Sequence, residues 1–356
     1  MPQEPHHTFD LNPSPVNPRN SEGAFATLTD GRIVFSYSHF TSGKEDDSAG
    51  HLASRFSSDG GCTWTTEDTP LQPNEGLKTT MSVGYVRLPT AELALFYIIK
   101  NSDSDCRLHM RTSVDDGASW GERVLCHADE GYHVTNNDRE HLLSTGRLVA
   151  PTSHHGAPFT EYGTAHMYYS DDLGRKWQVS ETVVAPFKDN TNTGLQEPAV
   201  VELRDGRLWM LCRTDQEYQW ESYSDDGGIR WSTPRPCEHF AAPTSPISMK
   251  RIPNSGDLLA IWNDHSGRFP VPPPQTHRAN WGRTPLVSAI SKDDGHTWGC
   301  HRLIESDFVH GYCYTAIHFT NDAVLLAYCA GDPDCGWVLS RTRIRRVPVG
   351  WFYSER

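Results

Sequence analysis

The chain alternates between short apolar runs and polar turns, and this pattern recurs along its whole length. Two clear examples are EGAFATLTDGRIVFSYS (22–38) and EPAVVELRDGRLWMLCR (197–213), in which a turn written Asp-Gly-Arg separates two apolar runs. A pair of short apolar or alternating runs joined by such a turn predicts a β-hairpin. Similar pairs start at residues 81, 137, 245 and 314. The sequence therefore predicts six hairpins and little helix.

A second pattern is an eight-residue segment that occurs five times, each time after a hairpin. The copies are SSDGGCTW (57–64), SVDDGASW (113–120), SDDLGRKW (170–177), SDDGGIRW (224–231) and SKDDGHTW (291–298). Starts that recur at such intervals indicate repeated supersecondary units. Asp and Gly suit a tight turn, and the Trp can pack back between the strands of its own unit. We expect these segments to fix the fold and to take no part in chemistry.

Six strand-rich units predict an all-β fold, a six-bladed β-propeller with four antiparallel strands in each blade. The sixth unit, YTAIHFTNDAVLLAY, has no repeated segment after it, so we expect the ring to close there. The segments TFDL (8–11) and VPVGWFY (347–353) are available to complete this last blade. We find no domain boundary and predict one domain over residues 1–356. The proline-rich stretch 269–281 is predicted to be a surface loop in the fifth unit.

Composition and charge narrow the classes of partner. The net charge of −13 argues against non-specific binding to nucleic acid, and it requires positive charge to be gathered locally if the substrate is an anion. No long apolar run predicts a membrane span, and MPQEPHHTFDLNP does not resemble a signal segment. Nine cysteines without a CxxC pair are expected to be reduced. We therefore expect a cytoplasmic protein, and we leave open whether it forms a homo-oligomer.

Polar residues just ahead of the hairpins are the candidates for a functional site. Propellers bind ligands at the mouth of the channel, near the starts of the innermost strands, and equivalent positions in six blades converge there. The candidates are Arg19, Glu22, Asn137, Asp138, Arg139, Glu197, Arg213, Arg283, Tyr312 and Tyr314. The planar guanidinium of arginine matches a carboxylate with two hydrogen bonds. The arginines in this set therefore predict a site for an anion.

Other common kinds of site are not indicated. The chain has 18 histidines, but adjacent histidines in a strand point to opposite faces, and there is no HExxH pattern or cysteine-rich spacing. A glycine-rich phosphate loop and a GxSxG motif are also missing. We expect neither a metal ion nor a cofactor.

The five repeated segments on a six-unit pattern resemble the Asp-boxes, or BNR repeats, of the sialidase (neuraminidase) superfamily, in particular its bacterial sialidase-like branch. The resemblance covers essentially the whole chain. In that family three arginines bind the carboxylate of the sugar, a tyrosine activated by a glutamate is the nucleophile, and an aspartate is the general acid and base. The resemblance therefore implies a catalytic site at the channel mouth.

The resemblance can be carried over residue by residue. EPAVVELRDGRLWMLCR is similar to the family segment that holds the glutamate and the second arginine, which implies Glu197 and Arg213. YTAI resembles the family's Tyr-Ser-x-Leu and implies Tyr314 as nucleophile. Arg283, eight residues before the Ser of the fifth Asp-box, has the place of the third arginine.

The N-terminal part departs from the family pattern. Arg19 has the place of the first arginine, but it lies in PRNSEG, whereas the family has Phe/Tyr-Arg-Ile-Pro. The acid/base aspartate is implied in GKEDDSAGHL, where the sequence does not separate Asp46 from Asp47. Asn137, Asp138 and Arg139 form a set that the family does not require, and we expect them to contact the substrate.

These features predict an exo-acting glycoside hydrolase that removes a terminal acidic sugar, such as sialic acid, with retention through a glycosyl-tyrosine intermediate. A phenol with a pKa near 10 needs a neighbouring base, and Glu197 has that role in this prediction. One alternative, which the departures keep open, is a propeller glycosidase retuned to a uronate, a keto-deoxy sugar or a deoxysugar. The other is a carbohydrate-binding propeller without catalysis.

Overall fold

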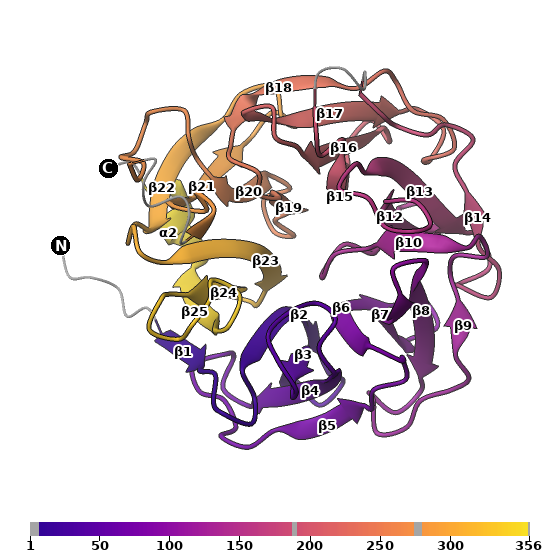
Figure 1. The fold of residues 1–356 in the computed structure, drawn as a ribbon. Helices are drawn as coiled ribbons and strands as arrows, with labels where there is room; N and C mark the ends of the chain where they lie inside the picture. The colour runs from indigo at the N-terminus through magenta and orange to yellow at the C-terminus, as the bar shows by residue number, and fades with distance from the viewer. Residues whose placement is uncertain (1–6, 187–190, 274–279, 355–356) are drawn as a thin grey trace.

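The computed structural model describes residues 7–186, 191–273 and 280–354. It is an all-β structure whose sheets are arranged in a ring around a common centre, and the chain runs once around this ring (Figure 1). The central part of the proline-rich stretch 269–281, residues 274–279, lies outside the described residues.

Four of the sheets have four strands each. The first contains β2 (Arg19–Thr27), β3 (Ile33–Phe40), β4 (Gly50–Ser57) and β5 (Thr69–Gln72). The second contains β15 (Gln196–Glu202), β16 (Leu208–Arg213), β17 (Tyr218–Ser224) and β18 (Arg235–Ala241). The third contains β19 (Ser248–Arg251), β20 (Leu258–Asn263), β21 (Leu286–Ser291) and β22 (Gly299–Glu305). The fourth contains β1 (His7–Leu11), β25 (Thr342–Pro348), β24 (Ala323–Gly331) and β23 (Gly311–Phe319). Consecutive strands in each order pair antiparallel.

The fifth sheet is larger because a short strand joins two groups of strands. One group is β6 (Thr79–Arg87), β7 (Leu93–Ser102), β8 (Asp105–Ser113) and β9 (Val124–Leu125). The other is β11 (His141–Leu142), β12 (Leu148–His154), β13 (Thr164–Ser170) and β14 (Gln178–Val179). The joining strand, β10 (Gly131–Val134), pairs parallel with β8 and antiparallel with β12, which makes one nine-stranded sheet. The sequence did not predict this strand.

The ring closes where the two ends of the chain meet. Strand β1 pairs antiparallel with β25, with Phe9 opposite Ile344, so TFDL completes the last sheet as expected. The expectation for VPVGWFY is wrong beyond its first two residues, because Val349–Tyr353 form the short helix α2. Pro348 has no backbone N–H to continue the strand pairing, and Phe352 of the helix is buried in the core.

The five repeated segments form the same turn. In the first copy the Ser57 hydroxyl donates to the Asp59 carboxylate (2.8 Å) and accepts from the backbone N–H of Gly61 (2.9 Å). The same carboxylate accepts from the N–H of Thr63 (2.9 Å). Corresponding hydrogen bonds occur in the other four copies. Each Asp therefore binds backbone groups of its own turn.

Glycines and tryptophans of these turns pack against the neighbouring sheet. Gly61 has φ of 91°, and a Cβ atom there would lie 2.5 Å from Leu325 of the neighbouring sheet. Gly295 likewise has φ of 94° and lies against Trp209. Trp298 also reaches the neighbouring sheet, with its ring 5.0 Å from that of Phe240. We expected the Trp to pack within its own unit, but it lies in the core between two sheets.

Apolar cores lie between each group of strands and the next around the ring. The pairs that share a core are β2–β4 with β6–β7, β6–β8 with β12–β13, β12–β13 with β15–β16, β15–β18 with β19–β21, β19–β22 with β23–β25, and β23–β25 with β2–β4. Burial of these faces is the main stabilising contribution of the fold. In the described part of the chain, no helix has the length and apolar character needed to cross a membrane.

Candidate active site

The strands nearest the centre of the ring carry polar residues in an unusual backbone conformation. Glu22 (φ 47°), Ser82 (φ 56°), Glu197 (φ 46°) and Tyr314 (φ 59°) all lie where the pairing of β2, β6, β15 or β23 shifts register. Such bulges re-aim side chains, and a positive φ in a residue other than glycine costs about 1–3 kcal/mol. These bulges turn Tyr314 toward Glu197, which lies on another sheet, and Glu22 toward Arg19.

Glu197 and Tyr314 form the centre of the site. The Tyr314 hydroxyl donates to Glu197 Oε1 (3.0 Å), and Arg213 Nη1 donates to Glu197 Oε2 (2.9 Å). Burial alone would raise the pKa of Glu197, but the positive charges of Arg213 and Arg283 lower it below its usual value. Burial and the negative charge of Glu197 raise the pKa of Tyr314. The resting pair is thus a neutral phenol that donates to an ionised carboxylate.

Arg283 lies on the other side of the tyrosine. Its guanidinium carbon is 5.2 Å from the centre of the Tyr314 ring and 4.7 Å from that of Trp281. Its Nη1 donates to the sulfur of Cys313 (3.1 Å), and its Nη2 has a long contact to the Thr244 carbonyl (3.5 Å). Although Arg283 is buried, nearby negative charge raises its pKa, so the guanidinium stays charged.

Three arginine Nε atoms at the site have spare donor capacity. The Nε groups of Arg139, Arg213 and Arg283 are buried and have no hydrogen-bond partner among the described residues. An unpaired buried donor costs about 1–3 kcal/mol. An oxyanion that accepts from these groups would recover this free energy, so the arrangement favours an anionic ligand.

Arg19 has more of its N–H groups hydrogen-bonded within the protein than Arg139, Arg213 or Arg283. Its Nη2 donates to Glu22 Oε1 (2.6 Å), and its Nη1 donates to Asp46 Oδ1 (2.6 Å) and to the Lys44 carbonyl (3.0 Å). Its Nε donates to Ser21 Oγ (2.8 Å). Burial disfavours its charge, but the two carboxylates outweigh burial and raise its pKa. Four of its five N–H groups are therefore occupied within the protein.

The two candidate aspartates have different partners. Asp46 binds Arg19, and although burial would raise the pKa of Asp46, the charge of Arg19 lowers it. Asp47 pairs with Lys100 and with Lys78 (3.4 Å), and its pKa is lowered chiefly by the hydrogen bond from Lys100. Both side chains stay about half exposed. The structure thus places Asp46, but not Asp47, in contact with a candidate arginine.

The side chains of Asn137 and Asp138 mostly connect strands. Asn137 donates to the carbonyls of Gly23 (2.7 Å) and Tyr314 (3.1 Å). Asp138 accepts from Lys250 Nζ (2.6 Å) and from the backbone N–H of residue 317 (2.9 Å). These bonds cross the centre of the ring between different sheets.

Arg139 is buried, and among the described residues its side chain makes one weak hydrogen bond, to Ser248 (3.4 Å). Burial lowers its pKa, and the charges of Asp138 and Glu197 act against this change. Arg139 therefore lies near the Glu197 pair, whereas Asn137 and Asp138 use their polar groups within the protein.

Two predicted mouth residues have unexpected places. Tyr312 is buried in the core between β19–β22 and β23–β25, with its ring stacked on His310, and does not join the site. Glu22, a candidate from the sequence to which no role was assigned, occupies the same bulge position in its strand as Glu197 and binds Arg19.

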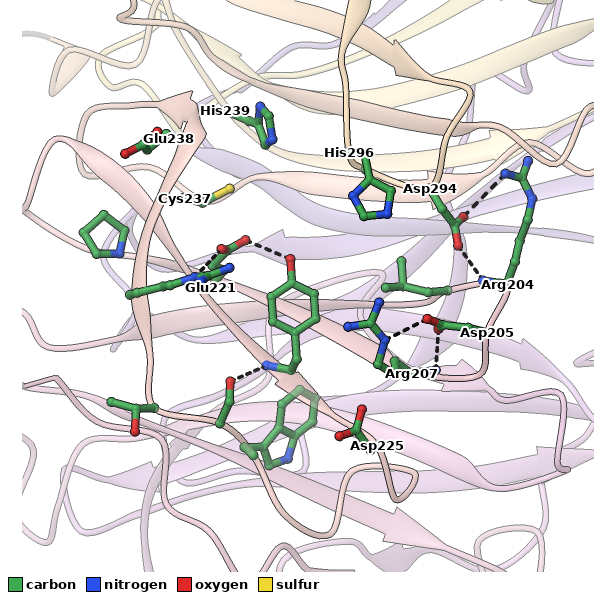
Figure 2. Close-up of a pocket in the computed structure, with 18 of the residues that line it drawn as sticks. Arg204, Asp205, Arg207, Glu221, Asp225, Cys237, Glu238, His239, Asp294 and His296 are labelled. Carbon is green, nitrogen blue, oxygen red and sulfur yellow. Dashed lines mark hydrogen bonds and ion pairs between the residues drawn. The ribbon is translucent and has the colours of Figure 1, made fainter.

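A large cleft lies away from these residues. It has a volume of about 1330 Å³ and lies beside the repeated turns at 224–231 and 291–298. Figure 2 shows that two of its arginines pair with neighbouring carboxylates: Arg207 binds Asp205 (2.8 Å), and Arg204 lies beside Asp294 (3.9 Å). It contains none of the predicted site residues. Among the described residues, no group of three or more His, Cys, Asp or Glu side chains is placed to hold a metal ion.

Comparison with known proteins agrees with this architecture. The model of the BNR repeat-like domain family matches residues 31–326. The chain belongs to this family. It is a sialidase-like BNR repeat protein, 22% identical over 312 residues to a sialidase from Micromonospora viridifaciens. That match covers 79% of this chain and 45% of the relative, so the chain spans less than half the length of the curated relative.

Solved structures show the same propeller-type fold for this BNR repeat protein. The intramolecular trans-sialidase from Ruminococcus gnavus, in complex with oseltamivir carboxylate, is 13% identical with a TM-score of 0.72, over 98% of both chains. A protein of unknown function from Dyadobacter fermentans is 14% identical with a TM-score of 0.72, over 96% of this chain and 98% of that one. At these identities the likeness is one of fold.

Proposed function

We propose that this protein is a retaining exo-glycosidase of sialidase type that removes a terminal acidic sugar. The observation that carries the proposal is the hydrogen bond from Tyr314 to Glu197, with Arg213 bound to the same carboxylate. A phenol becomes a useful nucleophile when an adjacent base takes its proton. A neutral nucleophile also avoids repulsion from an anionic sugar.

The proposed fold is one domain with six blades, five of which carry an Asp-box turn between their third and fourth strands. Six consecutive apolar cores around the ring support this count, and the joining strand β10 accounts for the nine-stranded sheet. The repeated hydrogen bonds of the five turns support a purely structural role for the boxes.

In the proposed first step, Tyr314 Oη forms a bond to the anomeric carbon while Glu197 Oε1 accepts the phenol proton. The bond between the anomeric carbon and the leaving oxygen breaks, and that oxygen takes a proton from Asp46. In the second step water attacks the anomeric carbon and gives a proton to Asp46, while Tyr314 leaves and regains its proton from Glu197. Two displacements retain the configuration.

Asp46 must change its state during this cycle. In the structure it is ionised and bound to Arg19, so it has no proton to give. A substrate carboxylate bound to Arg19 competes with Asp46 for the same guanidinium. Loss of that contact raises the pKa of Asp46, and we expect it to become an acid only when the substrate is present.

The occupied state of Arg19 favours a second candidate substrate. If Glu22 and Asp46 stay on Arg19, the acid group of the sugar is left to Arg139, Arg213 and Arg283. A uronate or another acidic sugar with a different carboxylate position then fits the same nucleophile. A panel of aryl glycosides separates the two candidates.

The first test is hydrolysis of an aryl α-sialoside by the wild type and by Tyr314→Phe. We expect the wild type to release the aryl group and the variant to lose about 10³-fold or more in kcat, as expected when an activated nucleophile is removed. Tyr312→Phe is the matched control, because this neighbouring tyrosine of β23 lies in the core. Equal rates for wild type and Tyr314→Phe would refute the role of Tyr314. No release from sialosides but release from aryl uronides would establish the second candidate.

A further inference from the structure

Two thiols face each other next to the candidate nucleophile, Tyr314. Cys313 on β23 and Cys329 on β24 are opposite residues in an antiparallel pair, and both are buried. Directly opposite residues in such a pair have Cα atoms about 4.5–5.5 Å apart. Disulfides span Cα distances of about 4.4–6.8 Å, so the backbone already brings the two cysteines within bonding range.

One of these thiols also holds a residue of the proposed site. Cys313 Sγ accepts the hydrogen bond from Arg283 Nη1 (3.1 Å), and the next residue along the chain is Tyr314. Tyr314 and Trp337 pack against the small apolar cluster that contains both cysteines. Oxidation of Cys313 would therefore alter its hydrogen bond with Arg283 directly.

The two thiols differ in their readiness to ionise. Burial would raise the pKa of Cys313, but the hydrogen bond from Cys329 and the charge of Arg283 lower it below its usual value. Burial, together with the hydrogen bond and charge of Cys313, raises the pKa of Cys329. Burial raises the pKa of the other buried thiols, Cys106, Cys126, Cys212 and Cys237. A thiol with a lowered pKa next to a second thiol is the arrangement in which one sulfur is oxidised and the other resolves it.

We propose that Cys313 and Cys329 are an oxidisable dithiol, a modification site whose disulfide form loosens Arg283 and weakens binding of an anionic ligand. With hydrogen peroxide as oxidant, the Cys313 thiolate attacks one peroxide oxygen, forms a sulfenic acid and releases hydroxide. The Cys329 thiol then attacks the Cys313 sulfur and displaces its oxygen as water. Two thiols and one peroxide give one disulfide and two waters.

The disulfide changes what Arg283 contacts. A disulfide sulfur is a poor acceptor, so Arg283 loses its hydrogen bond to Cys313 and keeps the long contact to the Thr244 carbonyl. One lost hydrogen bond corresponds to about a two- to tenfold weaker ligand binding. This consequence rests on the proposed function, but formation of the disulfide does not.

The first experiment maps the oxidised cysteines. The full chain is treated with hydrogen peroxide, free thiols are blocked with N-ethylmaleimide, and peptides are mapped by mass spectrometry. We expect one cross-link, between the peptides of Cys313 and Cys329, which dithiothreitol reverses. If Cys313 and Cys329 still react with N-ethylmaleimide after oxidation and are not cross-linked, the proposal is overturned, whatever the activity of the protein.

The second experiment follows the hydrolysis of an aryl α-sialoside before and after oxidation. We expect KM to rise about two- to tenfold with a smaller change in kcat, and Cys329→Ser to lose this sensitivity to peroxide. Cys300 is a half-buried thiol outside the cluster, so the control variant Cys300→Ser should respond to peroxide as the wild type does. A cross-linked protein with unchanged KM would refute the link to Arg283. Absence of hydrolysis in the reduced wild type would instead count against the proposed function. The peptide map would still show whether Cys313 and Cys329 form a disulfide.

Discussion

Glu22 and Glu197 are the same residue type in the same bulge on two different sheets, yet their environments are opposite. Glu197 lies near two guanidiniums, Arg213 and Arg283, and its pKa is lowered. Glu22 shares one guanidinium, that of Arg19, with a second carboxylate, and burial raises its pKa. The ratio of positive to negative charge around each carboxylate, and not its place in the strand, decides whether it can act as a base.

The comparison also separates the two halves of the proposed site. The half around Glu197 keeps unpaired arginine donors and a phenol in hydrogen-bond contact with a carboxylate. The half around Arg19 is nearly saturated by the protein's own acceptors. We therefore propose that the half around Glu197 accepts the proton of the nucleophile. Before substrate binds, the half around Arg19 mainly holds the structure together through its ion pairs.

Exchanging each glutamate for its neutral analogue gives the largest expected effect on activity. Glu197→Gln removes the base, and we expect kcat for an aryl α-sialoside to fall about 10²- to 10⁴-fold. Glu22→Gln should change kcat less than about tenfold, because its amide oxygen can still accept from Arg19. Steady-state kinetics on both variants checks this. Similar losses in the two variants would mean that the two carboxylates share one role.

Removing the arginine from the saturated half should affect stability most. Arg19→Met leaves Glu22 and Asp46 without their shared partner, and we expect a loss of about 3–5 kcal/mol in the free energy of unfolding. Urea denaturation followed by tryptophan fluorescence measures it. Arg207→Met is the control, because its ion pair with Asp205 is exposed and should contribute nothing measurable. A small loss of stability in Arg19→Met would show that the ion pairs of Arg19 with Glu22 and Asp46 do not stabilise the fold.

Glu140 extends the comparison to a carboxylate without a direct cationic partner. It is buried against Gly84, one of its oxygens has no partner among the described residues, and burial raises its pKa to about 8. Because this folded-state pKa lies above the unfolded value near 4.3, the group favours folding at low pH. Its contribution is lost as the pH rises from about 4.3 to about 8.

Glu140→Gln should remove this dependence. We expect wild type and variant to differ by about 1 kcal/mol at pH 5, and the variant to be more stable by about 3–5 kcal/mol at pH 8. Urea denaturation at several pH values measures the difference. A difference that stays constant across this range would show that Glu140 does not titrate between the two states.

The sequence predicted best those features whose partners are close in the chain. The hairpins were predicted from the runs that flank the Asp-Gly-Arg turns, and the closing strand at 7–11 from its apolar pattern. The turn at 57–64 was predictable because Asp59 binds N–H groups only a few residues away. The helix at Val349–Tyr353 was missed because its burial depends on a neighbouring sheet.

The candidate site was predictable only in part, because its contacts join distant segments. Resemblance indicated Glu197 and Tyr314, which are 117 residues apart and proved to be in contact. No pattern separated Asp46 from Asp47, since the choice depends on how the loop meets Arg19 and Lys100. The bonds of Asn137 to backbone carbonyls of two other sheets were likewise invisible in the sequence.

The most direct test of the account is to trap the covalent intermediate. A sialosyl fluoride that carries a second fluorine beside the anomeric carbon reacts with the nucleophile and hydrolyses slowly, so the labelled residue can be found by peptide mapping. The account predicts a single glycosyl adduct on Tyr314, absent from Tyr314→Phe and strongly slowed in Glu197→Gln. An adduct on Asp46 or Glu197, or none on the wild type, would contradict it.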